Sequence, residues 1–329
     1  MPPAMPETAQ PPETPQALLL RLEWTVLKRL DGLLQGDHRT LARGTGLDLA
    51  DLREYQGGDD VRHIDWNVTA RLDAPHVRQF IEDRDLSAWF VLDLTGSVDF
   101  GSAVGSTKRA VIEGFTATLA RLLTRHGNRV GALIYRGGEQ LELLPPGAGR
   151  LQVLQLLTRL RQPPAPPRAG AETRLALPLA RAESLMRRRS MVFVLSDFVS
   201  APGWEAALGR LARRHDLMAV RVFDAMEMEL PAEAGLITVQ DAETGEQLLV
   251  DAQDPGFRQR FEAAVAAHED ALQAALAQAG VDVLELATDD DLLQALLRCT
   301  LLRRQRQRQP LPRRAPAELR RLDAAVAAA

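Results

Sequence analysis

A short stretch near the middle of the first half of the chain places three oxygen-bearing side chains at even spacing. Its sequence is AWFVLDLTGSVDFG, and Asp93, Thr95 and Ser97 follow a run of apolar residues at intervals of two. A carboxylate and two hydroxyls are ligands for a small hard cation, and Mg2+ prefers oxygen ligands in near-octahedral geometry while retaining waters. Neutral hydroxyls leave most of the charge of such an ion uncompensated, so a further ligand can approach. The spacing therefore predicts a cation site, with helix capping by Asp93 and Ser97 as the alternative.

A second stretch, MVFVLSD, repeats this arrangement of apolar residues followed by polar ones and ends in Ser196 and Asp197. Continuous apolar runs of this kind are typical of strands buried on both faces. In open α/β sheets, ligands bind outside the carboxyl ends of the strands, where the strand order reverses. If the two strands flank that point, Asp93 and Asp197 meet in one crevice. Thr173, at the start of the helix predicted before the second strand, either adds a hydroxyl to this crevice or caps its helix.

The elements that position these residues alternate along the chain. Strands are predicted at residues 89–92, 129–135, 140–144, 191–197 and 217–224 and from residue 281, with a hairpin at 235–252. Helices are predicted at residues 104–126, 149–161, 173–187, 204–214 and 255–279 and from residue 290. Strands that alternate with helices predict an α/β fold with a doubly wound, mostly parallel sheet.

The segments before residue 87 have a different composition. Residues 1–16 are rich in Pro, Glu, Thr and Gln and are predicted to be disordered. Apolar residues from Leu18 to Leu33 recur at helical spacing, which predicts an N-terminal amphipathic helix that ends near Gly36. Residues 43–85 interleave arginines with acidic residues without a helical period, so we expect short extended pieces. This charged preamble forms either a solvated surface or a partly buried ionic layer that braces loops.

The predicted domain organisation has four parts. A disordered segment (1–16) precedes the helix and preamble (17–86), the α/β domain (87–302) and a basic, proline-interrupted tail (303–329). The tail carries Arg303, Arg304, Arg306 and Arg308, and like-charge runs of this kind are usually solvated. Binding of the tail to nucleic acid or to an anionic membrane is the alternative.

The composition indicates a globular protein. The chain has 329 residues, 46% of them hydrophobic and 26% charged, and a net charge of −4, which argues against general nucleic-acid binding. No apolar run approaches the roughly 20 residues that cross a bilayer. The beginning of the chain lacks the features of a signal peptide, and Cys299 is the only cysteine, which excludes a disulfide within the chain. We therefore predict a cytoplasmic protein without a transmembrane segment, with peripheral membrane contact as an open alternative.

Three other kinds of site fit the sequence less well. A phosphotransferase of the haloacid dehalogenase type needs a second acid two residues after the first, where this chain has Thr95. A Rossmann site needs G-x-G-x-x-G after the first strand, and neither that motif nor a P-loop is present. His63 and Asp65 lack a zinc-binding spacing such as H-E-x-x-H. We therefore predict a binding module that is not an enzyme; a metal-dependent phosphotransferase or phosphatase that uses Asp93 is the alternative.

The sequence resembles domain of unknown function family 58, whose members carry a von Willebrand factor type A-like domain. The resemblance rests on LADLREYQGGDDVRHIDWNVTAR, on HVRQF and on the strand that leads to Asp93, Thr95 and Ser97, and it covers roughly residues 40–300. Two positions depart modestly from the family pattern. Thr95 stands where serine is usual and keeps the hydroxyl, and Val98 stands where methionine is frequent.

The resemblance implies a von Willebrand factor A-like fold and a metal-ion-dependent adhesion site. At this site Asp93, Thr95 and Ser97 would come from the first loop, Thr173 from the second and Asp197 from the third. It also implies a functional link to a MoxR-type AAA+ ATPase. We therefore expect an adaptor that binds Mg2+, or Mn2+ or Ca2+ in its place, and through the ion an acidic residue of an unidentified client protein.

Overall fold

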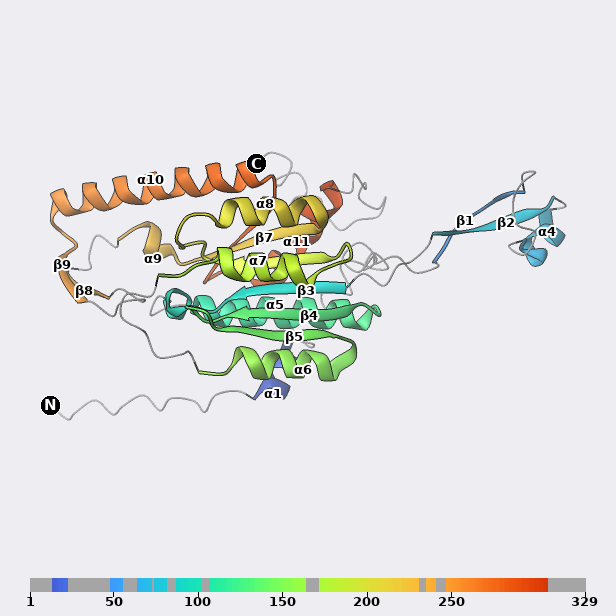
Figure 1. Cartoon of the computed structure of the whole chain (residues 1–329), viewed down its shortest axis with the longest axis horizontal. Coiled ribbons are helices and arrows are strands. Elements are labelled where there is room, and N and C mark those ends of the chain that lie inside the picture. The colour runs from blue at the N-terminus through green and yellow to red at the C-terminus, as the bar shows by residue number, and fades with distance from the viewer. Residues whose placement is uncertain are drawn as a thin grey trace.

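The computed structural model describes residues 14–22, 48–55, 64–72, 74–81, 87–101, 107–163, 172–230, 235–240 and 247–306. At its centre lies a six-stranded sheet in the order β10-β7-β6-β3-β4-β5 (Figure 1). Its strands are β3 (Ser87–Asp93), β4 (Arg129–Tyr135), β5 (Leu141–Gly147), β6 (Met191–Ser196), β7 (Asp216–Phe223) and β10 (Asp282–Ala287). All neighbouring pairs are parallel except β4 and β5, and the strand order reverses between β3 and β6. The predicted doubly wound, mostly parallel sheet is confirmed.

Helices cover both faces of this sheet. On one face, α1 (Pro15–Leu22), α5 (Lys108–Arg125), α6 (Gly149–Leu160) and α11 (Leu292–Arg306) contribute to a core that includes Phe90 and Leu92. On the other face, α7 (Ala176–Leu185), α8 (Trp204–Arg214) and α10 (Pro255–Ala279) pack with Trp89 and Val91. Successive side chains of a strand point to opposite faces, so a strand covered on both sides is apolar throughout. This explains why residues 88–92 of β3 form an unbroken apolar run.

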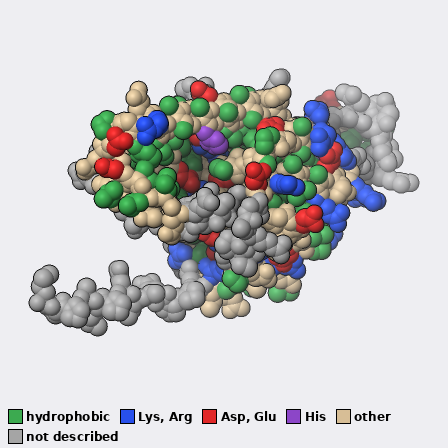
Figure 2. All heavy atoms as spheres, turned by 60° about the vertical axis from the view of Figure 1, so that its left-hand side comes forward, with side chains coloured by type: hydrophobic (Ala, Val, Ile, Leu, Met, Phe, Trp, Pro, Cys, Tyr) green, Lys and Arg blue, Asp and Glu red, His purple; other side chains and the backbone are tan. Residues whose placement is uncertain are grey.

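Two smaller strand pairs lie outside the six-stranded sheet. β1 (Asp48–Glu54) pairs antiparallel with β2 (His76–Ile81), and β8 (Leu236–Gln240) pairs antiparallel with β9 (Gln247–Asp251). The second pair confirms the predicted inserted hairpin. Its exposed apolar side chains include Leu236, Val239, Leu248 and Leu249. Hydrophobic side chains are visible on the surface at the end of the molecule where this hairpin lies (Figure 2).

The charged preamble contains a helix that was not predicted, α4 (Trp66–Leu72). Asp65 begins it: the Asp65 carboxylate accepts a hydrogen bond from the Val68 amide at 3.3 Å, and its carbonyl accepts one from the Thr69 amide. Capping initiates this short helix without an apolar period, since Trp66 and Leu72 are both exposed. The prediction of extended pieces alone was therefore wrong here.

Several predicted boundaries shift. α1 begins at Pro15, so the predicted disorder up to residue 16 is wrong at its end, while residues 1–13 and 23–36 lie outside the described residues. β5 runs through two prolines to Gly147, which an edge strand tolerates because one side of it needs no ladder partner. α5 begins at Lys108 behind the cap residue Thr107, and α11 extends to Arg306. The tail from residue 307 lies outside the described residues, and no helix within them is long and apolar enough to cross a membrane.

Candidate functional site

The candidate site lies at the carboxyl ends of β3 and β6, where the strand order reverses. These two strands pair in parallel with Leu92 opposite Leu195, so Asp93 and Ser196 end neighbouring strands. The Ser196 hydroxyl donates a hydrogen bond of 2.7 Å to Oδ2 of Asp93, and both residues are fully buried. Asp197 follows directly, and its charge acts on Asp93. The structure thus brings together the two carboxylates that the sequence placed at separate strand ends.

The loop after β3 folds back onto Asp93. The Thr95 hydroxyl and the Thr95 amide both donate to Oδ1 of Asp93, at 2.8 and 3.2 Å. The Ser97 hydroxyl lies 3.3 Å from that of Thr95. The short 3-10 helix η3 (Gly96–Asp99) has no side-chain cap bond, and α5 is capped by Thr107. In the described structure, Asp93 and Ser97 therefore do not cap the following helix, and the capping alternative is wrong.

Asp93 carries its charge at an energetic cost. Burial raises the pKa of Asp93 to about 6, and the negative charge of Asp197 acts in the same direction. Hydrogen bonds from Ser196 and Thr95 lower this pKa and offset part of the effect. These donors are neutral, so they leave the negative charge of Asp93 in place. Burial therefore disfavours the charged form of this carboxylate, and a cation beside it would favour that form.

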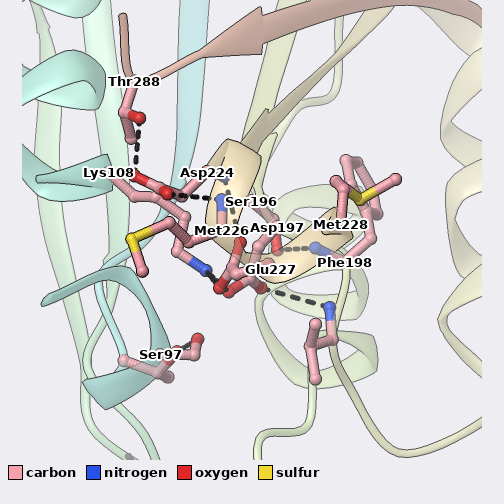
Figure 3. A network of polar contacts seen from close by, with 12 residues as sticks. Ser97, Lys108, Ser196, Asp197, Phe198, Asp224, Met226, Glu227, Met228 and Thr288 are labelled. Atoms are coloured by element: carbon pink, nitrogen blue, oxygen red, sulfur yellow. Dashed lines mark hydrogen bonds and ion pairs between the residues drawn. The ribbon is translucent and has the colours of Figure 1, made fainter. Parts of the chain in front are cut away.

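Asp197 already contacts a cation from the chain itself. Its Oδ1 accepts a bond from the Val199 amide at 3.1 Å, and its Oδ2 accepts one from Nζ of Lys108 at 2.9 Å. The same Nζ donates to Oε1 of Glu227 at 2.6 Å (Figure 3). Burial disfavours the charged form of Lys108, but Asp197 and Glu227 together outweigh burial and raise the pKa of Lys108. The lysine is therefore a charged, buried component of the crevice.

Neither Lys108 nor Glu227 was among the residues predicted for the site. One signal in the sequence pointed to Lys108, because 38 of the 40 basic residues are arginine and Lys108 is one of only two lysines. Glu227 lies in the short helix α9 (Ala225–Met228), which follows β7. Its spacing from the other site residues carries no recognisable motif.

Thr173 lies beside the loop that follows β6, but it does not begin a helix. α7 starts at Ala176 with Leu175 in the cap position, so the prediction that Thr173 opens or caps this helix was wrong. The Thr173 carbonyl accepts hydrogen bonds from the Ala201 amide at 2.8 Å and the Ser200 hydroxyl at 3.0 Å. These contacts join the second predicted loop of the site to the third, which carries Asp197.

The residues present suit a hard cation rather than a softer metal. The described residues contain no cluster of three or more His, Cys, Asp or Glu side chains that would bind a metal by themselves. Asp93 supplies a carboxylate with the hydroxyls of Thr95 and Ser97 nearby, an oxygen-only set of the kind that Mg2+ accepts when waters complete its shell. Of the rejected zinc pair, Asp65 caps α4 and His63 lies outside the described residues. The donor chemistry therefore fits Mg2+ on the Asp93 side of the crevice.

Comparison with known proteins identifies the family. Residues 51–271 match the family model described as "Protein of unknown function DUF58". The chain belongs to the DUF58 family. Uncharacterized protein Rv1480 of Mycobacterium tuberculosis is 38% identical to this DUF58 chain over 288 residues, which are 88% of this chain and 89% of the relative. Uncharacterized protein MAV169 of Mycobacterium avium is 33% identical over 163 residues, 49% of this chain and 94% of that protein. The predicted family is confirmed.

Solved structures also resemble this DUF58 chain. A conserved hypothetical protein, BatB from Bacteroides thetaiotaomicron, is 12% identical, with a TM-score of 0.42, and the match covers 68% of this chain and all of that one. The VWA domain of SpRpn10 is likewise 12% identical, with a TM-score of 0.34, over 64% of this chain and 94% of the other. At these identities the likeness concerns the fold alone.

Proposed function

We propose that this DUF58 protein is a binding module that takes up Mg2+ at the carboxyl edge of its sheet and, through the ion, binds an acidic residue of a partner protein. The observation that carries the proposal is the position of Asp93. Its carboxylate is fully buried at the reversal of strand order and receives hydrogen bonds from the neutral groups of Ser196 and Thr95. A divalent cation would offset the cost of keeping this carboxylate ionised.

Asp93, Thr95 and Ser97 would hold the ion, with Thr173 and Asp197 as further ligands from the two adjoining loops. The ion would supply positive charge for a partner's carboxylate, since hydroxyl ligands leave that charge largely uncompensated. The residues of the chain would position the ion at the end of the sheet and restrict the direction from which a partner approaches. Mn2+ or Ca2+ are alternatives to Mg2+ that the same oxygen ligands accept.

The alternative enzymatic role for Asp93 is less well supported. A phosphotransferase of the haloacid dehalogenase type needs a second acid two residues after its nucleophilic carboxylate. That position is Thr95 in this chain, and its hydroxyl donates a hydrogen bond to Asp93. We therefore favour a non-enzymatic adaptor. As its partner we propose a MoxR-type AAA+ ATPase, together with a client protein, on the strength of the family resemblance.

Thermal unfolding across a Mg2+ titration tests the metal site. Wild type should be stabilised by about 2.7 kcal/mol when free Mg2+ is about a hundredfold above its dissociation constant. Asp93→Ala should lose this response, and Thr173→Val should weaken it. Asp99→Ala is the matched control, because Asp99 lies in the same loop but is exposed and pairs with Arg109. A wild type without a Mg2+-dependent rise in melting temperature would refute the site.

Capture of a purified MoxR-type ATPase tests the partner. Wild type and Asp93→Ala are compared as bait at the same Mg2+ concentration, so that any need of the ATPase itself for Mg2+ is constant. We expect capture by wild type and at least about a tenfold loss with Asp93→Ala, as for removal of an interaction of about 1.4 kcal/mol or more. Equal capture by the two baits would show that the ion does not bridge the proteins.

A further inference from the structure

Among the described lysine and arginine residues, Lys108 has the least exposed side chain. It is the first residue of α5, its side chain is 1% exposed, and its Nζ bonds both Asp197 and Glu227. Burying an ammonium group is costly unless it is paired and hydrogen-bonded. Lysine carries its charge as a compact point on a flexible stem, whereas arginine presents a wide planar fork. The position therefore holds a small, movable cation inside the crevice.

The two carboxylates at the ends of β3 and β6 have different hydrogen-bond partners. The ammonium group of Lys108 contacts Oδ2 of Asp197. Asp197 is therefore paired with a cation of the chain, whereas Ser196 and Thr95, which donate to Asp93, are uncharged. An external cation that binds Asp93 would meet Asp197 already bonded to Lys108 and would be repelled by the lysine's charge.

Glu227 is held in place independently of Lys108. Its Oε2 accepts a hydrogen bond from the Asp224 amide at 3.1 Å, as part of the capping box of α9. Asp224 in turn accepts a bond of 2.7 Å from the Thr288 hydroxyl, at the end of β10 (Figure 3). Glu227 can therefore retain the ammonium group if Asp197 gives it up, because its position is set by the ends of two other strands.

We propose that Lys108 is a built-in cation that competes with a divalent ion for Asp197, and that Glu227 is the carboxylate that keeps Lys108 when the ion binds. The inference rests on the metal site proposed above and adds a residue that sets its affinity. In the metal-free protein, the lysine bridges Asp197 and Glu227 and partly neutralises the crevice. Binding of the ion to Asp93 and Asp197 then requires the lysine to give up one of its two bonds.

Calorimetric titration of MgCl2 into the full-length protein tests this competition. Lys108→Met should tighten Mg2+ binding by at least about tenfold, as expected when a competing contact of about 1.4 kcal/mol is removed. Lys108→Arg keeps the positive charge in a wider, planar group, so Mg2+ binding should not tighten as it does in Lys108→Met. Arg125→Met is the control, since it removes a positive charge from an exposed position in the last turn of the same helix.

A second pair of variants tests the role of Glu227 and does not depend on Lys108→Met folding. Glu227→Gln should weaken Mg2+ binding by about fivefold, because the lysine loses its other carboxylate and holds Asp197 more strongly. Glu229→Gln removes the same charge two residues away, at an exposed position, and should change binding by less than about twofold. In a Lys108→Met background, where that protein folds, the effect of Glu227→Gln should shrink to that of Glu229→Gln.

Failure of the Lys108 competition and failure of the metal site would give different results. If wild type and Lys108→Met bind Mg2+ equally, or Lys108→Met binds it more weakly, the competition is refuted while the metal site stands. If Lys108→Met does not fold, equal effects of Glu227→Gln and Glu229→Gln refute it. If wild type and every variant fail to bind Mg2+, both proposals are wrong.

Discussion

Individual residues of the crevice are charged at positions where burial makes charge expensive. Asp93 is fully buried among neutral donors, and Asp197 is 4% exposed and paired with Lys108. Buried ionised groups of this kind seldom contribute net stability, and they are often found where function requires a defined charge. These buried charges therefore lower the stability of the fold, as expected if the crevice is the binding site proposed above.

Replacing Asp93 with asparagine should stabilise the metal-free protein. The amide oxygen of the new side chain can still accept a hydrogen bond from Ser196 or Thr95, while the cost of burying a charge is removed. Because burial raises the pKa of Asp93 to about 6, the gain at pH 7 should be about 1–3 kcal/mol. Urea unfolding in EDTA measures it. Equal or lower stability of Asp93→Asn would contradict this account.

The raised pKa of Asp93 also sets the direction in which the stability of the protein changes with pH. The folded protein binds a proton at Asp93 more tightly than the unfolded chain does, so the stability due to this residue is full below the unfolded pKa and is lost as pH rises through about 6. The difference in unfolding free energy between Asp93→Asn and wild type should therefore grow from pH 4 to pH 7.

His215 should give a pH effect of the opposite sign. It is buried just before β7, its Nδ1 accepts a hydrogen bond from the Ser190 amide, and its Nε2 has no partner within the described structure. Burial, together with Arg214 and Arg189, lowers the pKa of His215. The unfolded chain then binds the proton more tightly, so stability falls as pH drops below the ordinary histidine pKa of about 6.5.

Replacement of His215 with asparagine tests this effect. The side-chain amide oxygen can accept the Ser190 bond but cannot titrate in this range. Melting temperatures of the two proteins between pH 5 and pH 8 should diverge toward low pH, with wild type falling more steeply. Parallel curves would exclude His215 as the source of acid sensitivity.

β3 and β4 pack closely where a glycine of one strand faces a tryptophan of the other. Gly131 of β4 lies opposite Trp89 of β3, and β3 is the strand that carries Asp93. A Cβ at Gly131 would lie 3.0 Å from Cε3 of Trp89 and 3.1 Å from Cγ of Pro146. The large indole therefore requires glycine on the neighbouring strand.

Gly131→Ala should destabilise the protein by about 1–3 kcal/mol, because the Trp89 ring and the edge strand must shift to admit a methyl group. Gly209→Ala in α8 is the matched control, since a Cβ there would lie 3.5 Å from the nearest atom, an ordinary contact. It should stabilise by about 0.5–1 kcal/mol through helix propensity. Chemical unfolding of both variants checks the contrast; a stabilising Gly131→Ala would show that the ring is not held as described.

The whole α/β unit extends beyond the predicted domain boundary at residue 87. α1 packs its buried residues Leu18, Leu19 and Leu22 into the same core as α5 and α6. A helix more than sixty residues before β3 in the chain therefore belongs to the core of one sheet face. Deleting it would remove part of that core rather than a separate attachment.

Leu19→Ala should cost about 2–5 kcal/mol, the range for truncating a fully buried leucine. Leu20→Ala, on the same helix at 50% exposure, should change stability by less than about 0.5 kcal/mol. Differential scanning calorimetry of the two variants measures the contrast. If both have the melting temperature of wild type, α1 does not contribute to the stability of the domain.

The sequence by itself was sufficient to predict the main helices and strands, the family and the two strand ends that form the crevice. The apolar runs that become β3 and β6 are local signals, and so are the Asp93 and Asp197 that follow them. The bounds of α8 and of α10, a long alanine-rich stretch, were likewise predicted from the sequence. Patterns of this kind can be recognised in a sequence because burial imposes a fixed spacing on the apolar residues of each element.

Only the tertiary structure decided how the charges of the crevice are paired. Lys108 meets Asp197 across 89 residues of chain and Glu227 across 119, contacts that no local pattern encodes. Thr173 was misassigned for a related reason: hydrogen bonds from Ser200 and Ala201, after β6, hold its carbonyl in a loop, and α7 begins three residues later. Such contacts depend on where the packed sheet brings its loops and strand ends, because each partner's position is set by a different element.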